Sequence, residues 1–109
     1  MKLTLFLFLA GFSTNIFAQD TVTIKTSAMC NSCKNRIESR LTKVKGIINS
    51  ELNVDSKLLT IIYDKAAIHI DAIEEEITKM GYDANLKTAK KAAYKRLPAC
   101  CRKDYVGSH

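Results

Sequence analysis

Two cysteines, Cys30 and Cys33, are the residues whose type and spacing most clearly indicate chemistry. We expect a short strand to end and a helix to begin here, with Cys30 in the loop and Cys33 in the first helical turn. Thiols placed in this way can point at one centre. The partial positive charge of a helix N-terminus favours the thiolate over the thiol, and thiolates select soft cations such as Cu(I) and Zn(II). The pair therefore predicts a soft-metal site.

A second pair, Cys100 and Cys101, stands near the end of the chain. Adjacent cysteines rarely bridge each other, because the closed ring strains the peptide, so a metal ion or the first pair is a more natural partner. A helix over residues 87–97 that runs back along the last strand would bring these thiols level with the first pair. We expect them to add thiolate ligands or a redox partner to the first site. The alternative is an unattached tail with two reactive thiols.

The N-terminus has the pattern of a secretory signal peptide, with Lys2, an apolar run over residues 3–12 and a polar exit. The apolar run is about half of the ~20 residues that a membrane span needs. Residues 1–18 are therefore expected to be a signal peptide, and the mature chain to be periplasmic without stable membrane insertion. The four cysteines of an exported chain could also form two structural disulfides, which is the main alternative for every thiol.

The formal net charge of +6 is concentrated near the C-terminus. Residues 19–86 contain nine Lys and Arg against ten Asp and Glu, whereas residues 87–109 contain seven against one. A basic tail can attract nucleic acid, but the chain has few aromatic residues to stack on bases, and an exported protein rarely meets nucleic acid. We expect no nucleic-acid partner and interpret residues 87–109 as a basic, solvated helical extension.

Hydrophobic periodicity predicts the order strand, helix, strand, strand, helix, strand. The strands are expected over residues 21–26, 48–54, 58–63 and 82–86, and the helices over residues 32–44, with Ser32 as N-cap, and 70–80. Two helices on one face of an antiparallel sheet make an α+β, ferredoxin-like β-α-β-β-α-β sandwich. The prediction is one domain over residues 19–86, followed by an additional C-terminal helix and a cysteine-containing tail.

Three further sequence motifs accompany the cysteine pair. They are Val44-Lys45-Gly46-Ile47 after the first helix, Thr60 to Asp64 in the third strand, and Gly81-Tyr82 before the fourth strand. With these motifs, residues 19–86 resemble the heavy-metal-associated domain of copper chaperones, metal-pumping ATPases and periplasmic mercury-binding proteins. The resemblance implies a site at Cys30 and Cys33. It also implies a transient partner that is a metal-transporting membrane protein or another metal-binding domain.

Two residues near the pair are compared with the family pattern. The family usually has a methionine two positions before the first cysteine, where this chain has Ala28, while Met29 stands next to Cys30. In the family that methionine packs under the loop, and Met29 is expected to do so from its shifted position or to be exposed. A tyrosine at the position of Tyr82 shields the metal in bacterial members, and the resemblance implies the same role here.

The function predicted from these observations is that of an exported, monomeric, non-catalytic protein that captures a soft metal ion and transfers or sequesters it. Two protein thiolates hold a two-coordinate ion such as Cu(I) or Hg(II) and leave room for the cysteines of a partner. Full tetrahedral thiolate ligation would favour Zn(II). The alternative is a thiol-disulfide oxidoreductase that uses Cys30 and Cys33 as its redox pair. Such motifs usually belong to the larger thioredoxin fold, which this strand order does not support.

Overall fold

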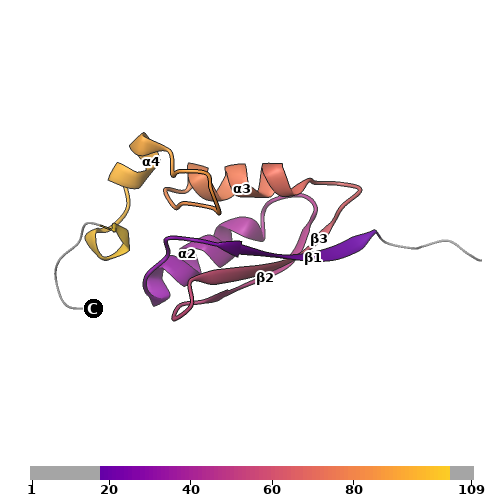
Figure 1. Cartoon of the computed structure of the whole chain (residues 1–109), viewed down its shortest axis with the longest axis horizontal. Helices are drawn as coiled ribbons and strands as arrows, with labels where there is room; N and C mark the ends of the chain where they lie inside the picture. The colour runs from indigo at the N-terminus through magenta and orange to yellow at the C-terminus, as the bar shows by residue number, and fades with distance from the viewer. Residues whose placement is uncertain (1–17, 104–109) are drawn as a thin grey trace, which may run out of the picture.

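The computed structural model describes residues 18–103, so the expected signal peptide, residues 1–18, lies outside the described residues except for Ala18. The elements in chain order are β1 (Gln19–Lys25), α2 (Asn31–Leu41), β2 (Ile47–Asn53), β3 (Leu58–Asp64), α3 (Ile70–Lys79), α4 (Lys91–Lys95) and the 3-10 turn η1 (Ala99–Cys101). Figure 1 shows α4 and η1 at one end of the sheet and helix layers. Within residues 18–103, no helix has the length and apolar character needed to cross a membrane.

The strand β3 is the centre of a three-stranded antiparallel sheet with the order β1-β3-β2. Leu59 of β3 pairs with Ile24 on one side and with Leu52 on the other. These three side chains are buried in one cluster with Ile37 of α2 and Ile73 of α3. Because alternate residues of a strand point to opposite faces, both helices cover the same face of the sheet (Figure 1). The expected α+β arrangement of two helices on a sheet is confirmed.

The helix α2 buries one residue in each turn, namely Cys33, Ile37 and Leu41. Residues four positions apart lie on one face of a helix, so these three residues form one apolar stripe that packs α2 on the sheet. The residue of this stripe in the first turn of the helix is Cys33, a thiol. The predicted start of this helix is wrong by a residue or two, because Cys30, not Ser32, occupies the N-cap. The carbonyl of Cys30 already accepts the first helical hydrogen bond, from the amide of Lys34 at 3.0 Å.

The strand β2 departs from the predicted alternation at its first residues. The pairing with β3 shifts register between Ile47 and Asn49, and the side chain of Ile48 is consequently 51% exposed. An irregularity of this kind reverses which residues face the core. Ile47 therefore packs against the core in place of Ile48.

The predicted fourth strand over residues 82–86 does not form. Ala84 makes one antiparallel bridge to Thr26 beside the end of β1, but the chain then reverses. The amide of Ala84 donates to the carbonyl of Lys87 at 3.0 Å, and the amide of Lys87 donates to Ala84 at 2.9 Å. Asn85, between them, has a φ of 55°, a conformation that asparagine tolerates in turns. This tight turn replaces the strand, so the full β-α-β-β-α-β pattern is not reached.

The helix predicted over residues 87–97 is also shorter than expected, since α4 covers only Lys91–Lys95. The residues before it are held in other ways. The amide of Ala89 donates to the Asp83 carboxylate at 2.9 Å, and the amide of Lys90 donates to the carbonyl of Thr78 at 3.0 Å. The tail nevertheless joins the fold, because Leu97 and Cys101 belong to the same buried cluster as the sheet and helices.

Gly81, between α3 and the tight turn, provides a test of how the tail is seated. Its φ is +105°, and a Cβ atom there would lie 2.9 Å from the carbonyl oxygen of Ala93 and 3.0 Å from Cγ of Leu97. We expect Gly81→Ala to lower the free energy of unfolding by about 1–3 kcal/mol from backbone strain, measured by chemical denaturation. It should also increase the reactivity of the tail thiols towards a thiol reagent, because the new methyl group pushes against the tail.

Gly46→Ala is the matched control, since Gly46 has a φ of +99° but contacts Ile68 instead of the tail. This variant should be destabilised without faster reaction of Cys100 and Cys101. Equal thiol reactivity in the two variants would contradict the proposed seating of the tail on Gly81.

Candidate metal centre

Cys30 and Cys33 lie at the N-terminal end of α2, with their Sγ atoms 3.4 Å apart. Cys30 has extended backbone angles at the N-cap position, and Cys33 sits in the first turn. The two thiols differ in burial, since Cys33 is fully buried while Cys30 is half-buried. The pair therefore has an inner thiol fixed in the core and an outer thiol that meets solvent.

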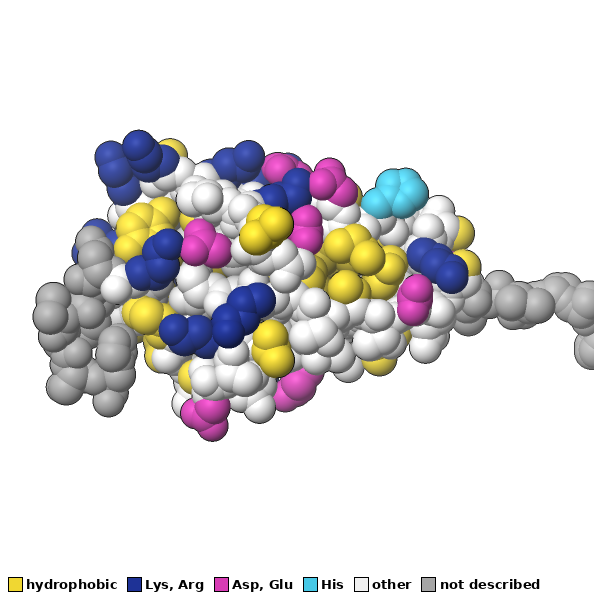
Figure 2. Space-filling view, viewed as in Figure 1, with side chains coloured by type: hydrophobic (Ala, Val, Ile, Leu, Met, Phe, Trp, Pro, Cys, Tyr) yellow, Lys and Arg dark blue, Asp and Glu magenta, His cyan; other side chains and the backbone are white. Residues whose placement is uncertain are grey.

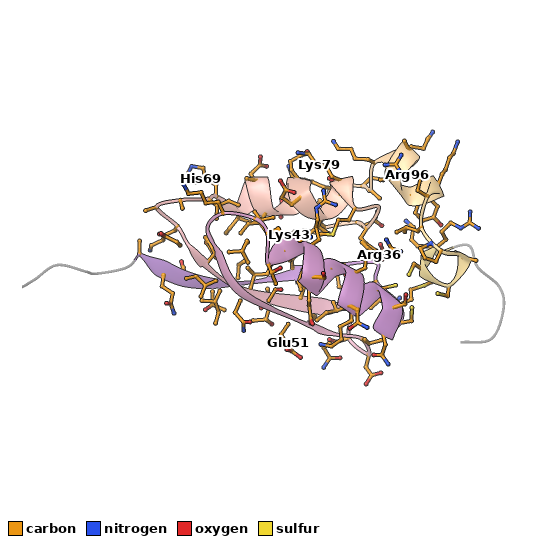
Figure 3. All side chains as sticks on the ribbon, turned by 180° about the vertical axis from the view of Figure 1, so that it is seen from behind. Arg36, Lys43, Glu51, His69, Lys79 and Arg96 are labelled. Atoms are coloured by element: carbon orange, nitrogen blue, oxygen red, sulfur yellow. The ribbon has the colours of Figure 1, made fainter. Side chains whose placement is uncertain are left out.

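The tail brings Cys100 and Cys101 to the same place. The Sγ atoms of Cys30 and Cys100 are 3.9 Å apart, and those of Cys30, Cys100 and Cys101 all lie within 4.8 Å of one another. No disulfide joins any of the four cysteines. Figure 3 shows the tail folded back over the first turn of α2, while His69 lies at the far end of the molecule. We call the four residues the four-thiol cluster.

The pKa values of the Cys30 and Cys33 thiols are shifted in opposite directions. Burial opposes ionisation of Cys30, but the nearby amide and thiol of Cys33, the amide of Ser32 and the thiol of Cys100 together lower its pKa. These amides favour the thiolate electrostatically at the helix start, although none makes a capping hydrogen bond. Burial, followed by the neighbouring Cys101 thiol, raises the pKa of Cys33 to about 11. Cys30 is therefore the thiol that ionises first.

Tyr82 lies against the inner side of the cluster and is fully buried. Burial, and then the adjacent thiols of Cys101 and Cys33, raise the pKa of its hydroxyl well above the usual range. Among the described residues, this hydroxyl has no hydrogen-bond partner. A buried donor without an acceptor is costly, and a thiolate beside it would supply the acceptor. The neutral cluster leaves the hydroxyl unpaired, which fits a site that takes on negative charge when a metal binds.

The loop before Cys30 is positioned by residues that the sequence reasoning did not single out. The side chain of Thr26 donates to the carbonyl of Lys57 at 3.0 Å and accepts from the amide of Ala28 at 3.1 Å. Ser27 accepts from the amide of Asp83 at 2.9 Å. Consecutive hydroxyl residues before a loop are a sequence signal for such side-chain to backbone bonds. The Ser27 bond ties the loop before Cys30 to the segment that carries Tyr82, and the Thr26 bond ties it to Lys57, the residue before β3.

Ala28 and Met29 take different environments in this loop. Ala28 is fully buried in the core, whereas Met29 is half-buried. The backbone of Met29 lies beside the Cys33 thiol, where it favours the thiolate. The structure thus gives Met29 a place next to the site through its main chain, and a role of its side chain in shaping the site stays a prediction.

The donor set fits a soft ion. The group of described residues that could jointly hold a metal consists of cysteines alone, and thiolates select Cu(I), Zn(II) and similar ions over hard cations. Lys34, which follows Cys33, does not neutralise the cluster. Its ammonium is engaged by Glu38 at 2.8 Å and Glu51 at 3.0 Å.

Comparison with known proteins finds a match to the heavy-metal-associated domain family over residues 23–83. That range contains Cys30, Cys33 and Tyr82 and ends before the tail. The chain is 33% identical over 61 residues to the copper chaperone CopZ of Staphylococcus epidermidis, covering 55% of this chain and 90% of that protein. It is 37% identical over 70 residues to a copper-exporting P-type ATPase of Staphylococcus saprophyticus, covering 62% of this chain and 9% of the ATPase. The chain thus spans only a small part of the ATPases it matches.

The fold is also similar to that of solved structures. Oxidized MerP from Ralstonia metallidurans CH34 superposes with a TM-score of 0.60 at 19% identity, covering 65% of this chain and 100% of that chain. The water-soluble region of the P-type ATPase CopA from Bacillus subtilis gives a TM-score of 0.60 at 31% identity, covering 64% of this chain and 47% of that one. At its low identity, the first similarity concerns the fold alone.

The lowered pKa of Cys30 and the raised pKa of Cys33 predict different rates of reaction with an alkylating reagent. In the reduced, metal-free protein near neutral pH, Cys30 should react with iodoacetamide at least about tenfold faster than Cys33, because its thiolate fraction is larger and it meets solvent. Peptide mass spectrometry at successive times measures both rates. The rate at Cys33 should rise only as the pH approaches its raised pKa of about 11. Equal rates in the folded protein would contradict this assignment, and urea-unfolded protein, where the two thiols should react alike, is the control.

Proposed function

The chain belongs to the heavy-metal-associated domain family, and from that premise we propose that it captures a soft metal ion through the thiolates of Cys30 and Cys33 and transfers or sequesters it. Cu(I) is the first choice of ion because several relatives are copper proteins by name. Hg(II) and Zn(II) remain the other candidates. The observation that carries the proposal is the pair of sulfurs 3.4 Å apart at the start of α2, inside the matched range.

The two thiols divide the work of capture. Cys30, whose pKa is lowered and whose side chain meets solvent, is the first thiolate that an arriving ion meets. Cys33 then loses its proton to solvent as the ion binds, because ligation requires the thiolate. A partner's thiolates can enter such an open pair and replace its sulfurs one at a time. Two ligands on one rigid turn thus allow both capture and release.

The family is non-catalytic and metallochaperone-like, as expected from the sequence, and this favours a binding role over the thiol-disulfide oxidoreductase alternative. The two roles differ in a simple assay. A metal-binding protein takes up a stoichiometric amount of ion without turnover, whereas an oxidoreductase reduces or oxidises a disulfide substrate repeatedly through Cys30 and Cys33.

We also propose the setting in which this binding operates. The N-terminal pattern of residues 1–18 supports export to the periplasm, where we expect the protein to be a monomer. The partner would be a metal-transporting membrane protein or another metal-binding domain that docks transiently. A groove lined by Arg36, Arg40, Lys79 and Arg96 lies between α2, α3 and α4, and Figure 2 shows basic side chains over the end that carries α4. This charge favours a partner with an acidic face.

Removal of the pair tests the proposal. The variant with Cys30→Ser and Cys33→Ala should lose tight Cu(I) binding, because it lacks both thiolates at the helix start, while the alanine avoids burying a hydroxyl in the core. Anaerobic titration of reduced protein against a Cu(I) chelator, with native mass spectrometry for stoichiometry, measures this. Ser32→Ala changes the same loop without removing a thiol and should bind normally. Unchanged affinity in the double variant would refute the assignment.

Tyr82→Phe should have opposite effects on the metal-free and metal-loaded protein. The metal-free variant should gain about 1 kcal/mol in the free energy of unfolding, because it no longer buries an unpaired hydroxyl. The Cu(I) affinity should fall by about tenfold, because a donor to the thiolates is lost, as for other groups that support metal ligands. Denaturation and chelator competition measure the two effects. A metal-free protein that is destabilised would show that the hydroxyl has a structural partner.

A further inference from the structure

We propose that Cys100 and Cys101 are metal ligands that close the open Cys30–Cys33 pair into a site of three or four thiolates, held by one chain, for a soft cation such as Cu(I) or Zn(II). The inference rests on the proposed function of the first pair. It goes beyond the family match, which ends at residue 83.

The tail thiols are placed by packing and not by chance proximity. Cys101 is 1% exposed and Leu97 is 6% exposed, and both belong to the main buried cluster. Before α4, the tail is held to Thr78 by a backbone hydrogen bond of 3.0 Å. After η1, Lys103 pairs with Asp83 at 2.9 Å. The segment that carries the two thiols is thus attached on both sides, which an unattached tail would not be.

The distances between sulfur atoms suit a shared ion. A tetrahedral site with metal–sulfur bonds of about 2.3 Å has sulfur–sulfur edges of about 3.8 Å. The Cys30 sulfur lies 3.4 Å from that of Cys33 and 3.9 Å from that of Cys100. Cys101 lies within 4.8 Å of Cys30 and Cys100 and beside the Cys33 thiol. Cys30 is therefore the corner shared by the Cys30–Cys33 pair and the group of Cys30, Cys100 and Cys101. Cys33 is outside that group of three, so a site with four thiolates requires side-chain shifts as the ion binds.

Two buried hydrogen-bond donors in this region have no partner among the described residues, and the proposed site would carry negative charge. Each ligating thiol loses its proton to solvent, so four thiolates carry more charge than one soft cation neutralises. The Tyr82 hydroxyl lies against the thiols without a hydrogen-bond partner. Arg102, directly after Cys101, also keeps its Nε atom buried without a partner among the described residues. A thiolate sulfur would give the Tyr82 hydroxyl an acceptor, and Arg102 places a positive charge next in sequence to a proposed ligand.

The closed site changes how the ion leaves. The tail thiolates occupy the coordination positions that a partner's cysteines would otherwise enter. Release then requires Cys100 or Cys101 to leave as each new thiolate arrives. The tail therefore acts as an internal substitute for the partner, and it favours retention until a partner is docked.

X-ray absorption of the loaded full-length protein tests the proposal directly. With one equivalent of Cu(I) or Zn(II), the spectrum should show three or four sulfur ligands. The variant with Cys100→Ser and Cys101→Ala, with alanine at the buried position, should show about two sulfurs on Cu(I). It should bind at least about tenfold more weakly, since even groups outside the ligand shell change affinity 10–100-fold. Ala99→Ser, an exposed change on the same turn, is the matched control and should behave like the original protein.

The outcomes separate this inference from the proposed function. Two sulfurs on Cu(I) in the original protein, with unchanged affinity in the Cys100→Ser, Cys101→Ala variant, would overturn the inference and leave the Cys30–Cys33 assignment intact. Retained binding in the Cys30→Ser, Cys33→Ala variant would overturn the proposed function itself. Because the sulfur count of the original protein does not depend on any variant, a misfolded variant cannot leave the inference untested.

Discussion

The burial of Cys33 in the first turn of α2 is the contact on which the site depends. Cys33 is the first residue of the buried apolar stripe that it forms with Ile37 and Leu41. Packing of the helix on the sheet therefore fixes the position of its sulfur without any metal. With Cys33 anchored, Cys30 must stand at the N-cap, one turn earlier and nearer to solvent. The acidity difference between the two thiols follows from this placement, because burial penalises the charged form of one and the helix amides stabilise that of the other.

The same packing explains why the tail reaches the site. The turn that follows α3 begins at Gly81, whose missing side chain leaves room for Ala93 and Leu97. Tyr82 then fills the space beneath the thiols, and Asp83 holds Ala89 and Lys103. Each of these residues connects the family domain to the tail. The charge pair to Lys103 is largely exposed and contributes little, so burial of Leu97 and Cys101 is the stronger attachment.

Much of this arrangement could be predicted from the sequence, because the hydrophobic period and the cysteine spacing are patterns within short stretches of the chain. The sheet, the two helices and the placement of Cys30 and Cys33 follow from such patterns. The tight turn that replaces the predicted fourth strand could not be foreseen. Residues 82–86 alternate apolar and polar side chains as a strand does, whereas the reversal depends on hydrogen bonds between Ala84 and Lys87. The shift at Ile48 likewise depends on pairing with β3. The contact between the tail and the site depends on the packing of Ala93 and Leu97 against Gly81. No short stretch of the sequence indicates that packing.

The chain thus combines an open pair suited to transfer with two tail thiols suited to retention. Thiols on the same chain act at an effective concentration that a free partner reaches only after docking. A dilute partner therefore competes poorly with Cys100 and Cys101, whereas a docked partner presents its thiolates at comparable concentration. Such a site would discriminate between ligands that meet the ion by collision and those that bind the protein surface first.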